Sequence, residues 1–283
     1  MAKIEKNNTL PVYDAIAINQ KAIHSGSTQP CIMTLADKDG NIKGEYVVKV
    51  FKPSNLSQSF NTNKEVYGSV LASEFDLMTP EAVLANVNQQ LIDELNNTPR
   101  YKGFNLIKGT YFATKYIDYA MDFSKATTLK LEDWEIENIF AFDVLIRNQD
   151  RRHNKPNLFY KDNEVYLIDH ELSLATGYLD KPFPEMVLDK NKYWRFVEII
   201  DGDFERKHIF LDALRERNKK KSVNFDTFRE DLRNFDVDIL DDYVLQLKNF
   251  NYDTEDYYAI KSYLIDVKNN PELFIKLLKD LML

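Results

Sequence analysis

Three side chains suited to metal-assisted chemistry lie close together in one stretch of the chain, IRNQDRRHNKPNLFYKDNEVYLIDHELS at positions 146–173. Asp150 and Asp169 carry carboxylates, and Asn157 carries an amide oxygen. Oxygen groups of these kinds are the ligands that Mg²⁺ prefers. A carboxylate held beside such a metal is suited to orient an attacking hydroxyl or accept its proton. The spacing therefore indicates metal-assisted transfer chemistry, provided that the local fold brings the three side chains together.

The segments NLFY (157–160) and VYLI (165–168) have the pattern of two short strands joined by the four-residue loop KDNE. Antiparallel counting across this loop places Asn157 opposite Ile168, and therefore beside Asp169. Side chains directly opposed in such a ladder lie about 5 Å apart, so that one Mg²⁺ can contact both. The hairpin thus predicts a metal site made by Asn157 and Asp169.

Asn154 competes with Asn157 as the amide ligand. It lies three residues earlier, before Pro156, and in an extended chain that distance is roughly 10 Å. We favour Asn157 because the hairpin count places it beside Asp169, but which asparagine binds the metal stays open at this point.

Asp150 is expected in a loop, because the stretch NQDRRHNKP favours neither regular helix nor strand. From such a loop its carboxylate would orient the acceptor hydroxyl. The neighbouring Arg151, Arg152 and His153 either stabilise this carboxylate or approach a transferring phosphate. In the alternative interpretation they only satisfy carbonyl groups at the end of a helix.

A nucleotide substrate would need a cation for its phosphates, and Lys49 in the strand-like segment YVVKVF is the candidate. Val47 and Phe51 flank it on the same face, so the ammonium would be partly buried. Because burial without a partner is costly, a functional Lys49 requires a carboxylate nearby. Glu65 is the favoured partner and Glu74 the second choice. The alternative is an edge-strand lysine that discourages sheet pairing.

A phosphate-binding loop is predicted at HSGSTQ (24–29). The Asp39-Gly40 pair favours a hairpin turn, and counting back through it pairs Lys49 near Pro30, so this loop lies beside Lys49. Gly26, Ser27 and Thr28 would offer backbone N–H groups to the phosphates. An ordinary connection between strands is the alternative. A serine or threonine here is also a candidate autophosphorylation site.

The elements around these residues predict an α+β fold. Two strand-like runs at 30–36 and 43–51 flank an Asp39-Gly40 turn, and apolar spacing predicts a helix over 63–75. Further strand-like runs lie at 82–92 and 110–117, and a buried helix is expected over 131–148. From about residue 190 nearly every segment has a helical pattern: 192–200, 205–218, 224–235, 241–250, 254–269 and 271–283. A small mixed-sheet lobe at 1–117 and a larger, mostly helical lobe at 118–283 follow from this order.

The composition limits the classes of function. The 283 residues, 44% of them hydrophobic, suffice for one large or two modest cores. A net charge of −8 disfavours broad binding to nucleic acid phosphates. We expect a cytoplasmic protein without membrane contact, because neither a signal-length apolar start nor a run of about 18 apolar residues occurs. The single cysteine, Cys31, excludes an internal disulfide and a multi-thiolate zinc site.

The segments FDVLIRNQDRRHNKPNLF and YLIDHELSLA resemble the core of the HipA-like kinases, in particular a short single-domain branch with an N-x-DR-x(4)-PNL motif and a following IDH. The resemblance is strong over residues 141–175, weaker over 20–117, and only a helical pattern after about 190. It implies a bilobal protein-kinase-like fold, more distantly similar to that of phosphatidylinositol kinases. The resemblance also implies ATP and Mg²⁺ as cofactors.

Residue by residue, the resemblance implies that Asp150 is the catalytic aspartate, Asn157 a metal ligand, and Asp169 the metal-binding aspartate in the role of the kinase DFG aspartate. It also points to Glu65 as the partner of the phosphate-binding lysine.

Fold analogy further places a hinge for adenine at Tyr116 and Ile117.

Two departures from the kinase pattern stand out. Protein kinases place an asparagine five residues after the catalytic aspartate, where this chain has Lys155. The DFG glycine is absent as well, because His170 and Glu171 follow Asp169. Glu171 is either an extra metal ligand or a solvated carboxylate.

Three hypotheses follow. The first is an ATP- and Mg²⁺-dependent phosphotransferase that acts on protein serine or threonine, itself included, or on a small-molecule or lipid hydroxyl. The second is an ATP-binding pseudokinase that works as an interaction module with a protein partner in a toxin–antitoxin or defence system. The third, a metal-dependent hydrolase built on Asp150, His153, Asp169 and His170, leaves Lys49 without a use.

Overall fold

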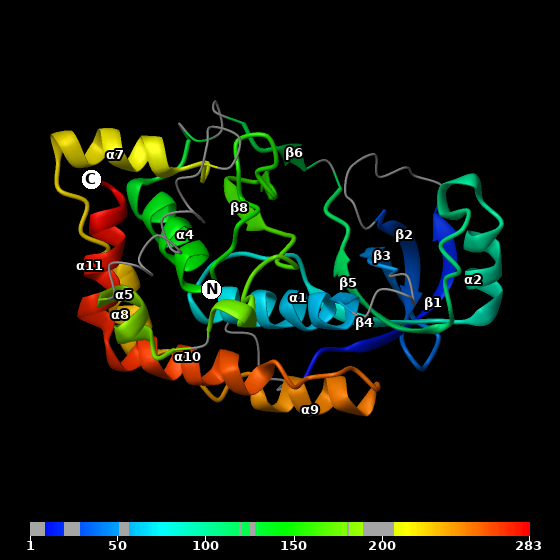
Figure 1. Ribbon diagram of the computed structural model, residues 1–283. Coiled ribbons are helices and arrows are strands. Elements are labelled where there is room, and N and C mark those ends of the chain that lie inside the picture. Colours follow the sequence, from blue (N-terminus) through cyan, green and yellow to red (C-terminus); the bar gives the residue numbers. More distant parts are fainter. Residues whose placement is uncertain are drawn as a thin grey trace. The chain divides into compact units, whose positions relative to one another are not determined.

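The chain divides into two compact units in the computed structural model, which describes residues 9–19, 29–50, 57–118, 120–124, 128, 130–179, 181–188 and 207–283 (Figure 1). Unit 1 consists of Met1–Val66, Pro80–Asp118 and Asp241–Thr254. Unit 2 consists of Tyr67–Thr79, Tyr119–Leu240 and Glu255–Leu283. The helical pattern at 192–200 lies outside the described residues.

The core of unit 1 is a closed five-stranded β-barrel with the strand order β1-β2-β3-β5-β4. Its strands are β1 (Val12–Asn19), β2 (Cys31–Ala36), β3 (Ile42–Val48), β4 (Ala82–Val87) and β5 (Gly109–Lys115). Strands β1 and β4 run parallel and the other neighbours antiparallel, so the sheet is mixed, as expected. Alternate side chains from these strands, Met33, Leu35 and Val48 among them, fill the interior of the barrel.

The hairpin of β2 and β3 turns where the sequence predicts it. The Oδ1 atom of Asp37 accepts hydrogen bonds from the backbone N–H groups of Asp39 and Asn41, at 3.0 and 2.9 Å. Gly40 has a φ of +82°, a left-handed conformation that glycine adopts without strain. The register pairs Val48 with Cys31, as the count through the turn requires.

The run at 82–92, predicted to be one strand, contains two elements. Strand β4 ends at Val87, and helix α2 (Gln89–Asn96) begins two residues later. The side chain of Asn88 caps this helix by accepting a hydrogen bond from the N–H of Leu91 at 3.0 Å. The prediction was wrong for residues 89–92 because the amide at the cap starts a helix within a continuous apolar run. A short 3₁₀ helix, η1 (Pro99–Tyr101), follows α2.

Helix α1 (Ser57–Glu74) begins earlier than the predicted 63–75, and the boundary between the two units falls within it, after Val66. Helix α9 (Asp241–Asn249) belongs to unit 1, although it lies far along the chain. Gln246 on α9 exchanges two hydrogen bonds with the backbone of Leu10, at 2.9 and 2.7 Å.

Unit 2 combines a three-stranded sheet with most of the helices. The sheet has the order β6 (Met121–Asp122), β7 (Leu158–Lys161) and β8 (Glu164–Leu167). Its helices are α4 (Asp133–Leu145), η2 (Thr176–Tyr178), α5 (Phe183–Leu188), α7 (Leu211–Lys220), α8 (Asp226–Asn234), α10 (Tyr257–Asn269) and α11 (Pro271–Leu281). The helix predicted at 131–148 is therefore present as α4, and helices lie in each segment predicted beyond 205, although the one predicted at 205–218 begins only at Leu211.

An aromatic cluster holds unit 2 together. Phe75 stacks on Phe228 with ring centroids 4.8 Å apart, and its ring also contacts Phe142 of α4. Phe228 in turn contacts Phe274 of α11. Aromatic pairs of this kind add to the free energy gained by burying their rings, so these contacts tie α4, α8 and α11 to the residue that directly follows α1.

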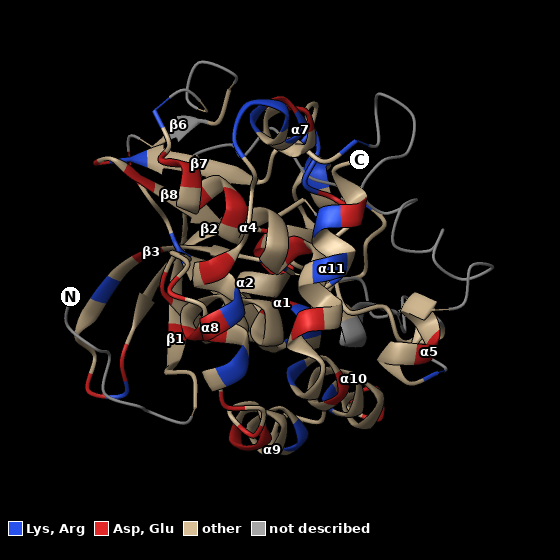
Figure 2. Cartoon of the chain, turned by 90° about the vertical axis from the view of Figure 1, so that its left-hand side faces the viewer, with Lys and Arg blue, Asp and Glu red and all other residues tan. Residues whose placement is uncertain are grey.

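Helices α7, α8 and α11 of unit 2 carry an acidic residue in the first turn and a basic residue in the last, and Figure 2 marks basic residues in blue and acidic residues in red along the chain. The last turn of α7 carries Arg217, Lys219 and Lys220, which offset the negative end of the helix dipole. Among the described residues, no helix combines the length and apolar character that crossing a membrane requires.

Candidate active site

The Asp150 loop begins where α4 ends, and one side chain ties it back to that helix. The Nδ2 atom of Asn148 donates to Oδ1 of Asp143 on α4, at 3.0 Å. The Oδ1 atom of Asn148 accepts from the backbone N–H of Asp150, also at 3.0 Å. Both bonds are buried, so the backbone position of Asp150 is determined by α4.

Asp143 is also the centre of a buried charge network. The Nε atom of Arg151 donates to Oδ2 of Asp143 at 2.5 Å, and the side chains of both residues are fully buried. The Nη1 atom of Arg151 donates to the carbonyl of Asn157 at 2.5 Å. Arg151 thereby links α4 to the start of the hairpin. The interpretation in which Arg151 approaches a phosphate is wrong, because its guanidinium is committed to this buried network.

His208 completes the network. Its Nε2 atom lies 2.9 Å from Oδ2 of Asp143, and its Nδ1 accepts a hydrogen bond from the N–H of Phe210 at 3.2 Å. The Nε2 atom therefore carries the proton of a neutral ring. Burial lowers the pKa of His208 below its usual value and outweighs the carboxylate beside it. Burial opposes ionisation of Asp143 too, but Arg151 and His208 outweigh it and hold the pKa of that carboxyl below its usual range.

The hairpin of β7 and β8 has the predicted register with a shorter turn. Tyr160 pairs with Val165, and the N–H of Ile168 donates to the carbonyl of Asn157 at 3.1 Å. The loop has two residues rather than four, since Lys161 pairs with Glu164. The turn residues, Asp162 and Asn163, have φ values of +52° and +66°, as in the turns that match the twist of a hairpin.

Asn157 lies against Asp150. Its Nδ2 atom donates to the backbone carbonyl and to Oδ2 of Asp150, both at 3.2 Å. Its backbone φ of +49° is a left-handed conformation that asparagine tolerates better than most residues. Asn154, in contrast, is exposed. The geometry thus favours Asn157 over Asn154 as the amide of the site.

Lys155 joins the two aspartates. Its Nζ atom forms an ion pair with Oδ2 of Asp150 and lies 3.1 Å from Oδ2 of Asp169. Burial opposes the charged form, yet the carboxylates of Asp169 and Asp150 outweigh it and raise the pKa of Lys155. Sequence reasoning noted Lys155 only as a departure from the kinase pattern and did not place it between the aspartates.

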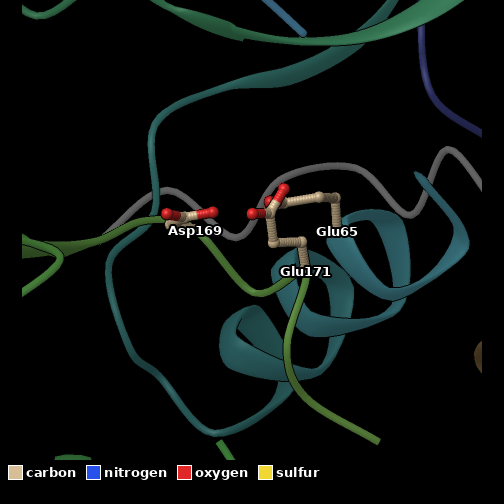
Figure 3. A group of neighbouring side chains, drawn as sticks. All are labelled: Glu65, Asp169 and Glu171. Atoms are coloured by element: carbon tan, nitrogen blue, oxygen red, sulfur yellow. The ribbon is translucent and has the colours of Figure 1, made fainter. Parts of the chain in front are cut away.

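Asp169 and Glu171 offer a second pair of oxygen ligands. They follow β8 on one short segment (Figure 3), and each has a carboxylate oxygen within 4.8 Å of the other. Glu171 is buried, which favours the metal-ligand interpretation over that of a solvated carboxylate. An amide and carboxylates are oxygen donors that suit Mg²⁺, so Asn157, Asp169 and Glu171 fit the metal that the kinase resemblance implies.

His170, between Asp169 and Glu171, is buried beside α1. Its ring packs edge-on against Phe142, with centroids 6.3 Å apart. A Cβ atom added at Gly68 of α1 would lie 2.5 Å from the Cβ and Cγ atoms of His170. Only glycine leaves room for this approach. Packing therefore explains His170, and the hydrolase hypothesis loses one of its proposed groups.

The substitution Gly68→Ala is expected to displace His170, and with it the adjacent Asp169. Helix propensity alone would favour alanine by about 1 kcal/mol, whereas overpacking costs about 1–3 kcal/mol. We expect a net loss of thermal stability together with weaker Mn²⁺ binding, measured by differential scanning calorimetry and electron paramagnetic resonance. Gly177→Ala is the matched control, because nothing lies within 4 Å of an added Cβ there. A variant with higher stability and unchanged Mn²⁺ binding would contradict the expectation.

The phosphate-binding candidates lie in unit 1. Lys49 directly follows β3 and continues its ladder, since its N–H donates to the carbonyl of Phe112 at 3.1 Å. Its Nζ atom forms an ion pair with Glu65 of α1, and both side chains are largely buried. The expected pair is therefore present, with Glu65 and not Glu74. The edge-strand alternative is wrong, because the barrel is closed and β3 pairs with both β2 and β5.

The predicted hinge follows β5. The N–H of Tyr116 donates to the carbonyl of Glu45 at 3.0 Å, so this group belongs to the barrel. An adenine contact at Tyr116 and Ile117 would therefore have to use backbone groups other than the N–H of Tyr116. The predicted loop residues Gly26, Ser27 and Thr28 lie outside the described residues.

Comparisons with known proteins give a family and a fold. The family model described as HipA-like kinase matches residues 16–191. The crystal structure of the Helicobacter pylori proinflammatory kinase CtkA is similar with a TM-score of 0.51 and 14% identity, covering 94% of this chain and 97% of that chain. The apo structure of a pseudokinase gives a TM-score of 0.31 and 11% identity, covering 99% and 97%. Among curated proteins no match was found. The similarity to CtkA shows that this sheet followed by mostly helical structure is a kinase-like fold.

Proposed function

Because this chain belongs to the HipA-like kinase family, we propose that it is an ATP- and Mg²⁺-dependent phosphotransferase whose acceptor is a protein serine or threonine. The observation that carries the proposal is the convergence of Asp150, Asn157 and Asp169 at the β7–β8 hairpin. A carboxylate that orients a hydroxyl and accepts its proton, together with two metal ligands, are the groups that phosphoryl transfer needs.

Each residue has a distinct role in this proposal. Asn157 and Asp169 hold Mg²⁺, which when bound neutralises phosphate charge. Asp150 orients the acceptor hydroxyl and takes its proton. Lys49 binds the nucleotide phosphates, and Glu65 keeps its ammonium charged and oriented toward them. Few side chains suffice, because positioning and charge neutralisation supply most of the rate enhancement in such chemistry.

The remaining parts of the proposal concern segments rather than single contacts. The loop with Gly26, Ser27 and Thr28 would cover the phosphates and offer a site of autophosphorylation. Tyr116 and Ile117 would form the adenine hinge. In this view residues 1–117 act as the nucleotide-binding lobe and 118–283 as the lobe of the catalytic loop, in a cytoplasmic enzyme.

A second candidate function is an ATP-binding pseudokinase that serves as an interaction module, in a toxin–antitoxin or defence system. The observation that favours it is Lys155, which stands five residues after Asp150 and pairs with both aspartates. The missing glycine after Asp169 points the same way. In this view the chain binds ATP without transferring its phosphate.

The test is to incubate the purified chain with ATP and Mg²⁺, take its intact mass, and add a panel of protein substrates while measuring ATP binding. The proposal expects phosphate on the chain or on a substrate, and peptide mapping then identifies the serine or threonine. ATP binding without any transfer would support the pseudokinase instead. If ATP does not bind at all, both candidates fail.

A further inference from the structure

The ammonium of Lys155 lies between the proposed general base and one of the proposed metal ligands. It contacts carboxylate oxygens of both Asp150 and Asp169, the second at 3.1 Å. We propose that Lys155 is a built-in competitor of the divalent cation: its ammonium holds carboxylate oxygens that the metal needs, and it gives up its contact with Asp169 when the metal binds. This inference rests on the metal site of the proposed function.

The chemistry of the side chain sets its ammonium and the metal in competition for Asp169. An asparagine at this position, as in protein kinases, would offer an oxygen to the metal. A lysine ammonium has three donors and no acceptor, so it cannot itself be a ligand of Mg²⁺ as an amide oxygen can. Its charge also repels the metal at close range. A metal bound at Asp169 therefore competes with the ammonium of Lys155, because the repulsion between the two charges drives the Nζ atom away from the carboxylate.

The backbone keeps Lys155 near the site when its ammonium leaves Asp169. The N–H of Lys155 donates to the carbonyl of Arg152 at 3.2 Å, and the N–H of Arg152 donates to the carbonyl of Lys155 at 3.0 Å. This closed turn holds the Cα atom. The side chain is 38% exposed and has a long flexible stem, so the ammonium can swing within a limited radius.

The same geometry determines what the displaced ammonium contacts. The backbone of Lys155 is held near Asp150, and Asp150 faces the transferred phosphate in the proposed reaction. A phosphate is the anion that arrives together with the metal, and lysine binds phosphates as a point charge. In the loaded state Lys155 therefore contacts the phosphate, so one side chain serves the empty and the loaded site.

The test uses the full chain without nucleotide and measures Mn²⁺ affinity by electron paramagnetic resonance. Lys155→Met removes the competitor, and the expected result is tighter Mn²⁺ binding, on the order of tenfold. Lys161→Met is the matched control, since it removes the same charge at the turn of the same hairpin, and its affinity should stay close to that of the parent. In the double variant that combines Lys155→Met with Asp169→Asn, the increase in Mn²⁺ affinity should disappear.

A Lys155→Met variant that binds Mn²⁺ no better than the parent overturns the inference, and so does a gain of equal size in Lys161→Met. If Lys155→Met proves unfolded by circular dichroism, Lys155→Gln replaces it with the same expectation. Phosphate transfer by the parent is measured in parallel. If Lys155→Met binds Mn²⁺ more tightly but the parent does not transfer phosphate, the phosphotransferase is refuted, whereas the proposal that Lys155 competes with the metal stands. If the parent transfers phosphate but Lys155→Met binds Mn²⁺ no more tightly than the parent, the phosphotransferase stands and the competitor is refuted.

Discussion

Asp150→Asn is expected to slow phosphate transfer by about 10²–10⁴-fold, the range that loss of a general base produces. The substitution keeps the shape of the side chain and removes its ability to accept a proton. ATP binding should persist, because the Lys49–Glu65 ion pair in unit 1 remains intact. Single-turnover phosphate transfer and equilibrium ATP binding, measured on the same preparation, separate these two effects.

Asp162→Asn is the matched control for Asp150→Asn. It makes the same chemical change at the exposed turn of the β7–β8 hairpin, where asparagine suits the left-handed backbone. Transfer by this variant should equal that of the parent. If Asp150→Asn transfers phosphate as fast as Asp162→Asn, then Asp150 is not the base and its assignment must be abandoned.

The hairpin at the centre of the site was predictable because strands impose a strict count. Asn157 had to fall opposite Ile168 once the two strands were recognised, and the pairing of Ile168 N–H with the Asn157 carbonyl confirms it. The Lys49–Glu65 pair was predictable for an energetic reason: a buried ammonium needs a carboxylate, and few candidates lie on the next helix.

Two other elements of unit 1 could not be predicted because their sequence patterns are weak or continuous with a neighbour. Strand β1 was not predicted, since most of its side chains are exposed or half-buried and Ala15 is its fully buried position, so it lacks the alternation that marks a strand. Helix α2 was merged with β4, because the apolar run continues through both and a single cap, Asn88, separates them.

The residues missed at the site are those whose role depends on contacts far apart in the chain. Asp143 interrupts the apolar helix α4, and a buried carboxylate there indicates that a positively charged or hydrogen-bonding partner lies nearby. Its partner His208, however, lies beyond the stretch at 189–206, and no local pattern connects the two. Lys155 was missed for another reason: its backbone is close to both aspartates in sequence, but only the turn with Arg152 aims the side chain between them.

The network around Asp143 leads to a second large expected effect, on stability. Asp143→Asn should lower the free energy of unfolding by about 3–5 kcal/mol, because it leaves the buried guanidinium of Arg151 without its counter-charge. Urea denaturation followed by circular dichroism measures the change. Asp212→Asn is the control: its ion pair with Lys207 is exposed on the aspartate side, so about 0–1 kcal/mol is expected.

The same substitution should reach the active site through two contacts. Arg151 holds the carbonyl of Asn157, and Asn148 holds the N–H of Asp150, and both depend on Asp143 for their positions. At temperatures where Asp143→Asn is still folded, transfer should therefore be slower than in Asp212→Asn, while ATP binding in unit 1 is unchanged. A stability loss below about 1 kcal/mol would mean that the charge of Asp143 is not what holds the loop, since that is the range of an exposed pair. Packing of α4 against the hairpin would then have to position Asp150 by itself.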